Sequence, residues 1–165
     1  MGKALPRKWK AYQFESKQAD TVFAARRGLV VEVVKEFGVD TTSHFQRNRN
    51  SIMIEHNDGT LAGYQGFARN GVFPKVGDKV EVNTALGTIR DGETRGALHF
   101  MAYFLVGFDY DQQSSANEFI SPEFATNKGQ TVLMPQKYYI VARSEELILQ
   151  EMSKRERKKY LQANK

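Results

Sequence analysis

The sequence has no cysteine and no long apolar run. Without cysteine, disulfide frameworks and thiolate metal sites are excluded. No stretch of about 18 apolar residues occurs, so no segment is expected to span a membrane as a helix. The first residues also lack the apolar segment of a secretory signal peptide, because Pro6 and Arg7 follow Ala4 and Leu5 directly. Histidine occurs only 3 times in 165 residues, at positions 44, 56 and 99.

The net charge of +5 is concentrated at the two ends of the chain. Residues 1–10 carry a net charge of +4 and residues 144–165 a net charge of +2, whereas the body between them has 14 basic and 15 acidic side chains. A nucleic-acid-binding domain of this size usually carries a basic face on its folded body. The distribution therefore argues against nucleic acid as a partner, and the basic C-terminal run is interpreted as a solvated helix face.

Short β-strands separated by glycine turns dominate the body of the chain. Ile52 and Ile54 alternate with Met53 ahead of Asp58-Gly59, a dipeptide that strongly favours a hairpin turn. The strands expected from this pattern cover residues 22–34, 51–55, 60–67, 79–82 and 98–106. Strands of this length and spacing predict one domain with a compact β-sandwich or β-barrel.

The region after residue 106 is expected to add a hairpin to this body. Residues 107–117 are polar and predict a surface loop. Strands are expected at 119–125 and 130–134, joined by the turn at 127–129. Pro122 places the first of them at the edge of a sheet, because proline cannot donate a ladder hydrogen bond.

A helix is expected at the C-terminus. Ser144 is a good N-cap, and Glu145 and Glu146 suit the positive end of the helix dipole. The residues after Lys154 are strongly basic and predict a frayed or solvated arm.

Four motifs between Asn50 and Phe100 stand in an order that resembles the lysostaphin-type (LytM-type) peptidoglycan endopeptidases. They are His56-Asn57-Asp58-Gly59, Tyr64-Gln65-Gly66, Val76-Gly77-Asp78-Lys79-Val80 and Ala97-Leu98-His99-Phe100. The corresponding motifs of the family are His-x-Asp-Gly, Tyr-x-His, Val-Gly-Asp-x-Val and His-x-His-Phe. The segment 22–30 also resembles the strand with which the family begins, and the whole resemblance runs from Trp9 to Phe104.

This resemblance implies a mainly β fold, the duplicated hybrid motif sandwich or barrel of LytM proteins, with an added β-hairpin and a C-terminal helix. The chain would divide into a basic N-terminal segment at 1–8, a LytM-like β domain at 9–106, an added loop and hairpin at 107–143, and a helix with a basic tail at 144–165. It also implies a periplasmic or other extracytoplasmic location, with an export signal that precedes this sequence.

The family's zinc site is mostly missing from this sequence. In the family, zinc is held by a His-x-x-x-Asp pair and by the second histidine of His-x-His, while two further histidines serve the reacting water and the oxyanion. The resemblance places Trp9 and Gln13 at the first two ligand positions and Gly66 and Ala97 at the auxiliary ones. Only His99 matches, and one imidazole cannot hold zinc. We therefore expect no metal, no cofactor and no catalytic residue.

The other histidines and acids do not replace the missing ligands. Glu15 can share a strand face with Gln13, but Glu15 and His99 together supply only two ligands where a catalytic zinc takes three. His56 lies in the turn motif and His44 in a polar loop, so neither is a good replacement.

The vacated groove is expected to bind a ligand through four side chains. They are Trp9, Tyr64, Phe67 and His99. Trp9 is the sole tryptophan of the chain, and it would either contact the ligand or close the groove as an apolar lid.

The resemblance, combined with the missing catalytic groups, predicts a non-catalytic domain that binds peptidoglycan or an envelope protein such as a wall amidase. It would regulate or position a cell-wall enzyme. One alternative is an active zinc endopeptidase that cleaves peptidoglycan cross-links with another set of ligands. A further alternative is an envelope structural or assembly protein.

Overall fold

The structure is a computed structural model that describes residues 10–16, 20–35, 50–89, 96–109, 114–142 and 145–163. Its strands and helices are β1 (Tyr12–Ser16), β2 (Thr21–Phe23), β3 (Gly28–Val34), β4 (Asn50–Glu55), β5 (Thr60–Val72), β6 (Lys79–Val80), β7 (Ala85–Ile89), β8 (Gly96–Asp109), β9 (Ser114–Phe119), β10 (Phe124–Thr126), β11 (Gly129–Thr131), α1 (Glu145–Gln150) and α2 (Lys154–Ala163). No helix within these ranges is long and apolar enough to cross a membrane.

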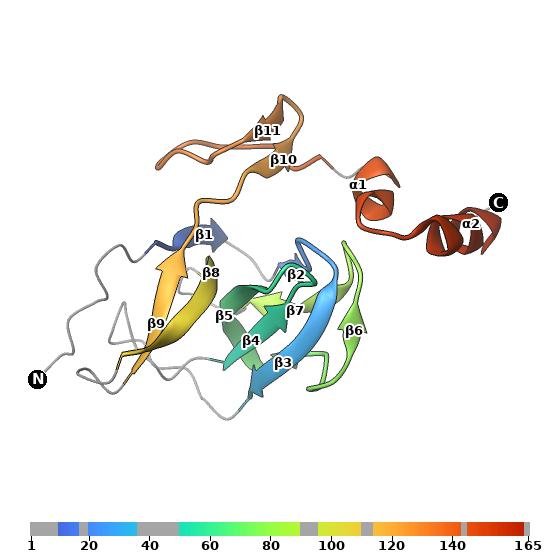
Figure 1. Ribbon diagram of the computed structural model, residues 1–165. Coiled ribbons are helices and arrows are strands. Elements are labelled where there is room, and N and C mark those ends of the chain that lie inside the picture. The colour runs from blue at the N-terminus through green and yellow to red at the C-terminus, as the bar shows by residue number, and fades with distance from the viewer. Residues whose placement is uncertain are drawn as a thin grey trace, which may run out of the picture.

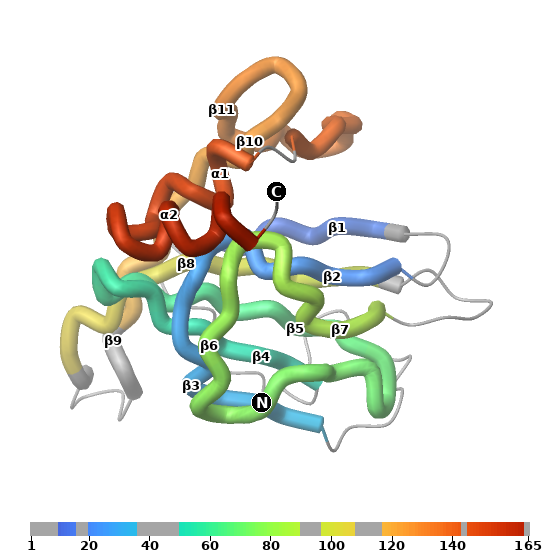
Figure 2. Tube along the Cα trace, turned by 90° about the vertical axis from the view of Figure 1, so that its right-hand side faces the viewer, coloured from blue at the N-terminus to red at the C-terminus, as the bar shows by residue number. Residues whose placement is uncertain are grey.

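Nine strands form one antiparallel sheet with the order β1-β8-β5-β4-β3-β6. β9 pairs with β8, and β7 pairs with both β5 and β2. Figure 1 shows these strands packed together, and Figure 2 shows the hairpin β10–β11 and both helices at one end of the strand stack. The prediction of a mainly β fold with an added hairpin and a C-terminal helix is confirmed.

The long strand β5 belongs to two parts of the sheet. Its first half pairs with β4 and β8, and its second half pairs with β7. Ser51 lies opposite Gln65 and Asn50 opposite Phe67, so Gly66 is the extra residue of a β-bulge. The side-chain amide of Asn50 donates hydrogen bonds to the backbone oxygens of Phe67 and Ala68 beside this bulge. A bulge of this kind bends a strand, which lets β5 pass from one pairing to the next.

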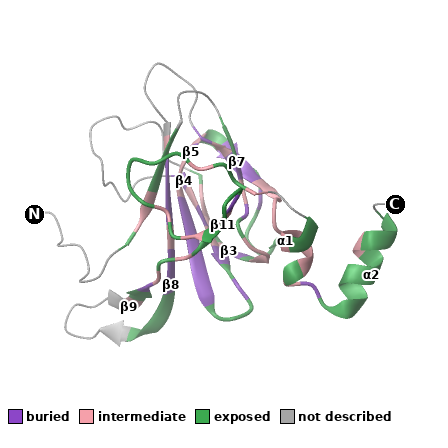
Figure 3. Ribbon diagram, turned by 90° about the horizontal axis from the view of Figure 1, so that it is seen from above, coloured by how far each residue is buried: buried purple, intermediate pink, exposed green. Residues whose placement is uncertain are grey.

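The main core cluster draws on β2 to β8, and a smaller buried cluster of Leu61, Tyr103 and Phe119 lies on β5, β8 and β9. Ile52, Ile54, Val30 and Leu86 are the most completely buried large side chains of the main cluster, with relative exposure of 1% or less. In Figure 3 the buried residues gather in the strands, whereas neither helix contains a buried residue. The β-branched residues of β3 and β4 suit this position, because their side chains pack well on a pleated surface.

Most of the predicted strands have different boundaries in the structure, and two differences change the organisation of the chain. Residues 22–34 form two strands, because the chain leaves β2 after Phe23 and resumes as β3 at Gly28. Residues 107–117 were expected to form a loop, but β8 extends to Asp109 and pairs with β9 from Ser114 onward. The expected domain boundary after residue 106 therefore falls inside β8.

The hairpin at 124–131 is shorter than predicted. β10 and β11 flank the turn at Asn127 and Lys128, and Gly129 has a positive φ of 97°. Pro122 lies before β10, so its assignment to an edge strand is wrong. The aromatic ring of Phe124 packs edge-on against Tyr12, Phe14 and Phe100, which fastens the hairpin to the body.

The C-terminal segment forms two helices, so the residues after Lys154 are helical and not frayed, and their exposure fits the interpretation of a solvated helix face. Ser153 and Glu156 form a capping box at the start of α2, with reciprocal bonds from the Ser153 N–H to Glu156 Oε2 (2.8 Å) and from the Glu156 N–H to Ser153 Oγ (3.3 Å). The sequence itself contains this Ser-x-x-Glu signal at positions 153 and 156.

Ion pairs attach these helices to the loop between β2 and β3. Arg26 pairs with Glu151 and with Asp58, and Arg27 pairs with Glu156 at 2.9 Å. Met152, between the two helices, is the only residue of 145–163 that is buried, at 9% exposure. The attachment is therefore mainly polar.

Candidate functional site

Strands β1, β8 and β5 bring together four of the five positions that the resemblance singles out. β8 lies between β1 and β5. His99 on β8 is paired with Gln13 on β1 and, across the other edge of β8, with Gln65 on β5. Glu15 lies opposite Ala97 in the same ladder. Direct partners in an antiparallel pair share a face of the sheet. Gln13, Glu15, Ala97 and His99 therefore lie on one face, as the sequence predicts for Glu15 and Gln13.

Hydrogen bonds join three of these side chains. His99 Nε2 lies 3.1 Å from Gln13 Oε1, and Gln13 Nε2 donates to Glu15 Oε1 at 3.1 Å. Because an amide oxygen only accepts hydrogen bonds, the first contact requires a proton on His99 Nε2. The His99 side chain is buried at 7% exposure, whereas Gln13 and Glu15 are exposed. The glutamine amide thus bridges a buried imidazole and a solvent-facing carboxylate.

Position 66 cannot hold a side chain in this backbone conformation. Gly66 has a φ of 109°, which side-chain-bearing residues rarely adopt. A Cβ atom at Gly66 would lie 2.2 Å from the backbone oxygen of Ala97. The backbone of the bulge therefore excludes a histidine at this position. Substituting Gly66 by histidine would not place an imidazole where the family has its Tyr-x-His histidine.

The described residues of this site do not fit a catalytic zinc. Nowhere in the described ranges do three or more His, Cys, Asp or Glu side chains gather as a metal site would require. Here His99 Nε2 faces the acceptor oxygen of Gln13, and Glu15 is the carboxylate that the Gln13 amide contacts. Zinc in a catalytic site takes three nitrogen, sulfur or carboxylate ligands. Trp9, at the other matched ligand position, lies outside the described residues.

Tyr64 and Phe67 lie in the core and not on the face of His99. Tyr64 is opposite Phe100, the neighbour of His99 on β8, and therefore projects to the other side of the sheet. Tyr64 and Phe67 are only 2% and 5% exposed. The grouping of these two residues with His99 in one groove is corrected by this placement. The resemblance predicts that Tyr64 lines the groove, but the alternation of side chains along β5 turns Tyr64 into the core.

The buried Tyr64 hydroxyl has a structural partner. It accepts a hydrogen bond from the Ala25 N–H at 3.0 Å, and the ring packs edge-on against Phe100 with 5.1 Å between the ring centroids. Burial raises the pKa of Tyr64 to about 12, although the bond from Ala25 acts in the opposite direction. The hydroxyl therefore stays protonated and anchors the loop between β2 and β3.

His56 also serves the structure of this loop. Its ring is buried, and Nδ1 lies 2.8 Å from the backbone oxygen of Arg27, to which it donates a hydrogen bond. Burial lowers the pKa of His56, so the ring is held neutral. A Cβ at Gly28 would come within 2.4 Å of the Glu55 oxygen and 3.0 Å of His56 Nδ1, which explains the glycine there. His44 lies outside the described residues.

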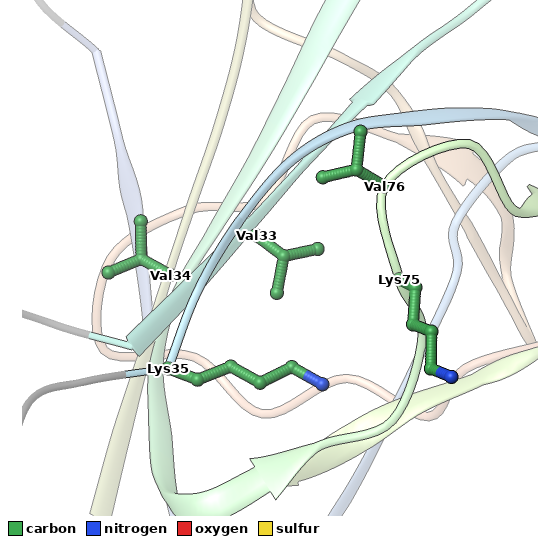
Figure 4. Close-up of a pocket in the computed structure, with 5 residues that line it drawn as sticks. All are labelled: Val33, Val34, Lys35, Lys75 and Val76. Carbon is green, nitrogen blue, oxygen red and sulfur yellow. The ribbon is translucent and has the colours of Figure 1, made fainter.

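An open pocket with a volume of about 470 Å³ lies at the other end of the sheet order and was not predicted from the sequence. It is lined by Val33, Val34, Lys35, Lys75 and Val76 (Figure 4). One wall contains Val76, the first residue of the Val76–Val80 motif that the sequence analysis identified. Its second wall, the end of β3, is about 40 residues away in sequence, so only the tertiary structure brings the two lysines together.

Comparisons with known proteins give likeness of fold only. Comparison with protein-family models and with curated proteins finds no match. Among solved structures, lysostaphin is 22% identical with a TM-score of 0.45, over 65% of this chain and 40% of that one. A protein described as a glycyl-glycine endopeptidase, LytM, from Ruminococcus gnavus is 18% identical with a TM-score of 0.40, over 59% and 36%. CbpA from L. salivarius REN is 15% identical with a TM-score of 0.38, over 59% and 60%.

The chain thus spans between about a third and three fifths of the length of these proteins. At these identities and scores they assign neither a family nor an activity to it.

Proposed function

We propose that this chain is a non-catalytic LytM-like domain that binds peptidoglycan or an envelope protein and regulates or positions a cell-wall enzyme outside the cytoplasm. The proposal rests on the motif order of the sequence and on one structural observation. At the position where the family holds zinc, His99 Nε2 is turned to the amide oxygen of Gln13 at 3.1 Å. A proton on this nitrogen and a metal ion on it are mutually exclusive.

The geometry also leaves the reaction without its auxiliary groups. Ala97 has no acid or base, and Gly66 has neither a side chain nor room for one. Nothing at these two positions can take a proton from water or stabilise an oxyanion. The site retains a hydrogen-bonding strip, Gln13 and Glu15 beside His99, that suits the amide and hydroxyl groups of a wall fragment.

Zinc content and wall lysis test the non-catalytic part of the proposal. The purified protein is expected to contain no stoichiometric zinc by elemental analysis and to leave the turbidity of a peptidoglycan suspension unchanged. One zinc per chain with lysis that EDTA abolishes would favour the active endopeptidase instead. Lysostaphin serves as the positive control for the turbidity assay.

Restoring ligands tests whether the resemblance places Trp9 and Gln13 correctly. The double variant Trp9→His/Gln13→Asp supplies, with His99, the three ligand types that the family uses. We expect this variant to bind zinc in equilibrium dialysis more tightly than the wild type, with the two single variants as matched controls. Equal zinc binding by all four proteins would show that these positions do not converge on His99.

Binding to the wall tests the remaining part. Because Trp9 is the sole tryptophan, titration with soluble wall fragments is expected to shift its fluorescence, and the protein is expected to sediment with purified sacculi. Trp9→Ala is expected to weaken sedimentation with little change in melting temperature if the indole contacts the ligand. A lower melting temperature with unchanged sedimentation would identify Trp9 as a lid. If neither sacculi nor a wall amidase binds, a structural role in the envelope becomes the better proposal.

A further inference from the structure

The pocket at the end of β3 combines an apolar floor with two cations. Val33, which packs against the hydrophobic core, and Val76 provide the apolar surface, whereas the Val34 side chain projects to the other side of β3 (Figure 4). Lys35 and Lys75 come from the two opposite walls, and the Lys35 side chain extends across the pocket toward the side of Lys75 (Figure 4). Pockets that bind small molecules are mostly apolar with a few polar groups that fix orientation, and 470 Å³ lies within their usual range.

The loop that carries Lys75 and Val76 is held in place by hydrogen bonds. Asp78 Oδ2 accepts a bond from the Lys75 N–H at 2.8 Å, and the Asp78 N–H donates to the Lys75 oxygen at 3.1 Å. Two further bonds tie the loop to β3, from the Gly77 N–H to the Val30 oxygen and from the Val30 N–H to the Asp78 oxygen. The two walls are therefore fixed relative to each other before any ligand arrives, which reduces the entropy cost of binding.

The charge of the two lysines is not neutralised within the described residues. The four ion pairs found among these residues are all made by Arg26 and Arg27. Their carboxylate partners are Asp58, Glu81, Glu151 and Glu156. Asp78, the acid nearest in sequence to Lys75, uses its carboxylate on the backbone N–H of that residue. Two ammonium groups beside one apolar floor, neither with a carboxylate partner among the residues that the structure describes, attract an anion that also has an aliphatic body.

We propose that this pocket binds a small aliphatic carboxylate, such as the carboxyl end of a peptide with a branched last residue. The carboxylate would lie between the ammonium groups of Lys35 and Lys75, and the aliphatic side chain would cover the valine floor. The pocket is at the β3 end of the sheet, and β8, β5 and β4 separate β3 from β1. The proposed site is therefore independent of the His99 site, and its failure would leave the zinc and wall-binding results as they stand.

The test is a titration of the whole protein, with labelled valine methyl groups followed by NMR. The probe is acetyl-alanyl-valine with a free carboxylate. It is compared with the same dipeptide as its carboxamide, with acetylglycine and with inorganic phosphate. We expect the methyl signals of Val33 and Val76 to shift with the free acid, and the carboxamide to bind about tenfold more weakly because it loses both charge contacts. Acetylglycine is expected to bind more weakly too, since it lacks the aliphatic side chain.

Variants assign the contacts. Lys35→Gln and Lys75→Gln are each expected to weaken binding of the free acid roughly two- to fivefold, as for exposed ion pairs, with a larger loss in the double variant. Lys128→Gln, in the exposed turn between β10 and β11, is the matched control and is expected to change nothing. All three lysines are exposed, so the fold is expected to survive each change.

Equal affinity for the acid and the carboxamide, or unchanged affinity in the double variant, would overturn the proposal. Phosphate that binds as tightly as the dipeptide would show a general anion site and would also overturn it.

Discussion

The β-sheet and the C-terminal helices are held by different forces. In the sheet, side chains such as Ile52 and Ile54 are almost fully buried, and the core extends across both pairings of β5. Neither helix contains a buried residue, and between them only Met152 is buried. This segment is attached by Arg26 and Arg27 through ion pairs to Glu151 and Glu156. Burial of apolar area is the dominant stabilising term in folding, whereas exposed ion pairs are weak and screened by salt. The sheet is therefore expected to be stable without the helices, but not the reverse.

The largest effect is expected from a cavity in the sheet. Ile54→Ala removes a side chain with 0% exposure and is expected to lower the free energy of unfolding by about 3–4 kcal/mol. Leu161→Ala in α2, where the side chain is 40% exposed, is the matched control and is expected to cost less than about 0.5 kcal/mol. Urea unfolding measures both. Similar losses in the two variants would refute the difference between the regions.

Tyr64→Phe is expected to have the next largest effect. It keeps the ring in the core but removes the acceptor for the Ala25 N–H, at a cost of about 1–2 kcal/mol. A loss below about 0.3 kcal/mol would mean that water replaces the hydroxyl at Ala25. Hydrogen exchange at the Ala25 amide distinguishes these outcomes directly.

The pH dependence of the free energy of unfolding tests whether burial lowers the pKa of His56. Its folded-state pKa lies below the ordinary value of 6.5 because the ring is buried. The unfolded chain therefore takes up a proton before the folded protein does, and stability falls as the pH drops from about 6.5 toward the lower folded pKa. His56→Asn, which keeps a donor near the Arg27 oxygen, is expected to remove this part of the pH dependence in urea midpoints. An unchanged profile would show that His56 does not contribute.

The smallest effect is expected from deleting residues 154–165. The hydrogen bond from Arg27 lowers the pKa of Glu156 to about 2, but this carboxylate is exposed and the contact is screened by solvent. Thermal melts are expected to shift by no more than about 3 °C, and the shift is expected to shrink at 1 M salt. A large shift that persists in high salt would mean that α2 contributes apolar packing.

The strand pattern could be predicted because it depends on neighbouring residues. Alternation of Ile52 and Ile54 with Met53 identified β4, and Asp58-Gly59 located the β4–β5 hairpin, where Gly59 has a φ of 79°. The break between β2 and β3 was missed because residues 24–27 are held by tertiary contacts. The Tyr64 hydroxyl bonds Ala25, and Arg26 and Arg27 bond the C-terminal segment.

The candidate site could be predicted only in part. The motif order brought Gln13, Gly66, Ala97 and His99 into consideration, and the structure places them on adjacent strands. The role of these residues stays a prediction. Tyr64 was misplaced because a motif does not state which face of the sheet a residue occupies, and this depends on register.

By itself the sequence determined the mainly β class, the glycine turns, the absence of thiol chemistry and the absence of histidine at positions 66 and 97. Only the tertiary structure decided that Gly66 is a bulge residue with no space for a side chain and that the Gln13 amide oxygen is hydrogen-bonded to His99 Nε2. It also decided that Lys35 and Lys75 line one pocket. The physical reason is the range of the interactions. Turns and alternation arise from residues a few positions apart, whereas bulge contacts, side-chain hydrogen bonds and pocket walls join residues tens of positions apart.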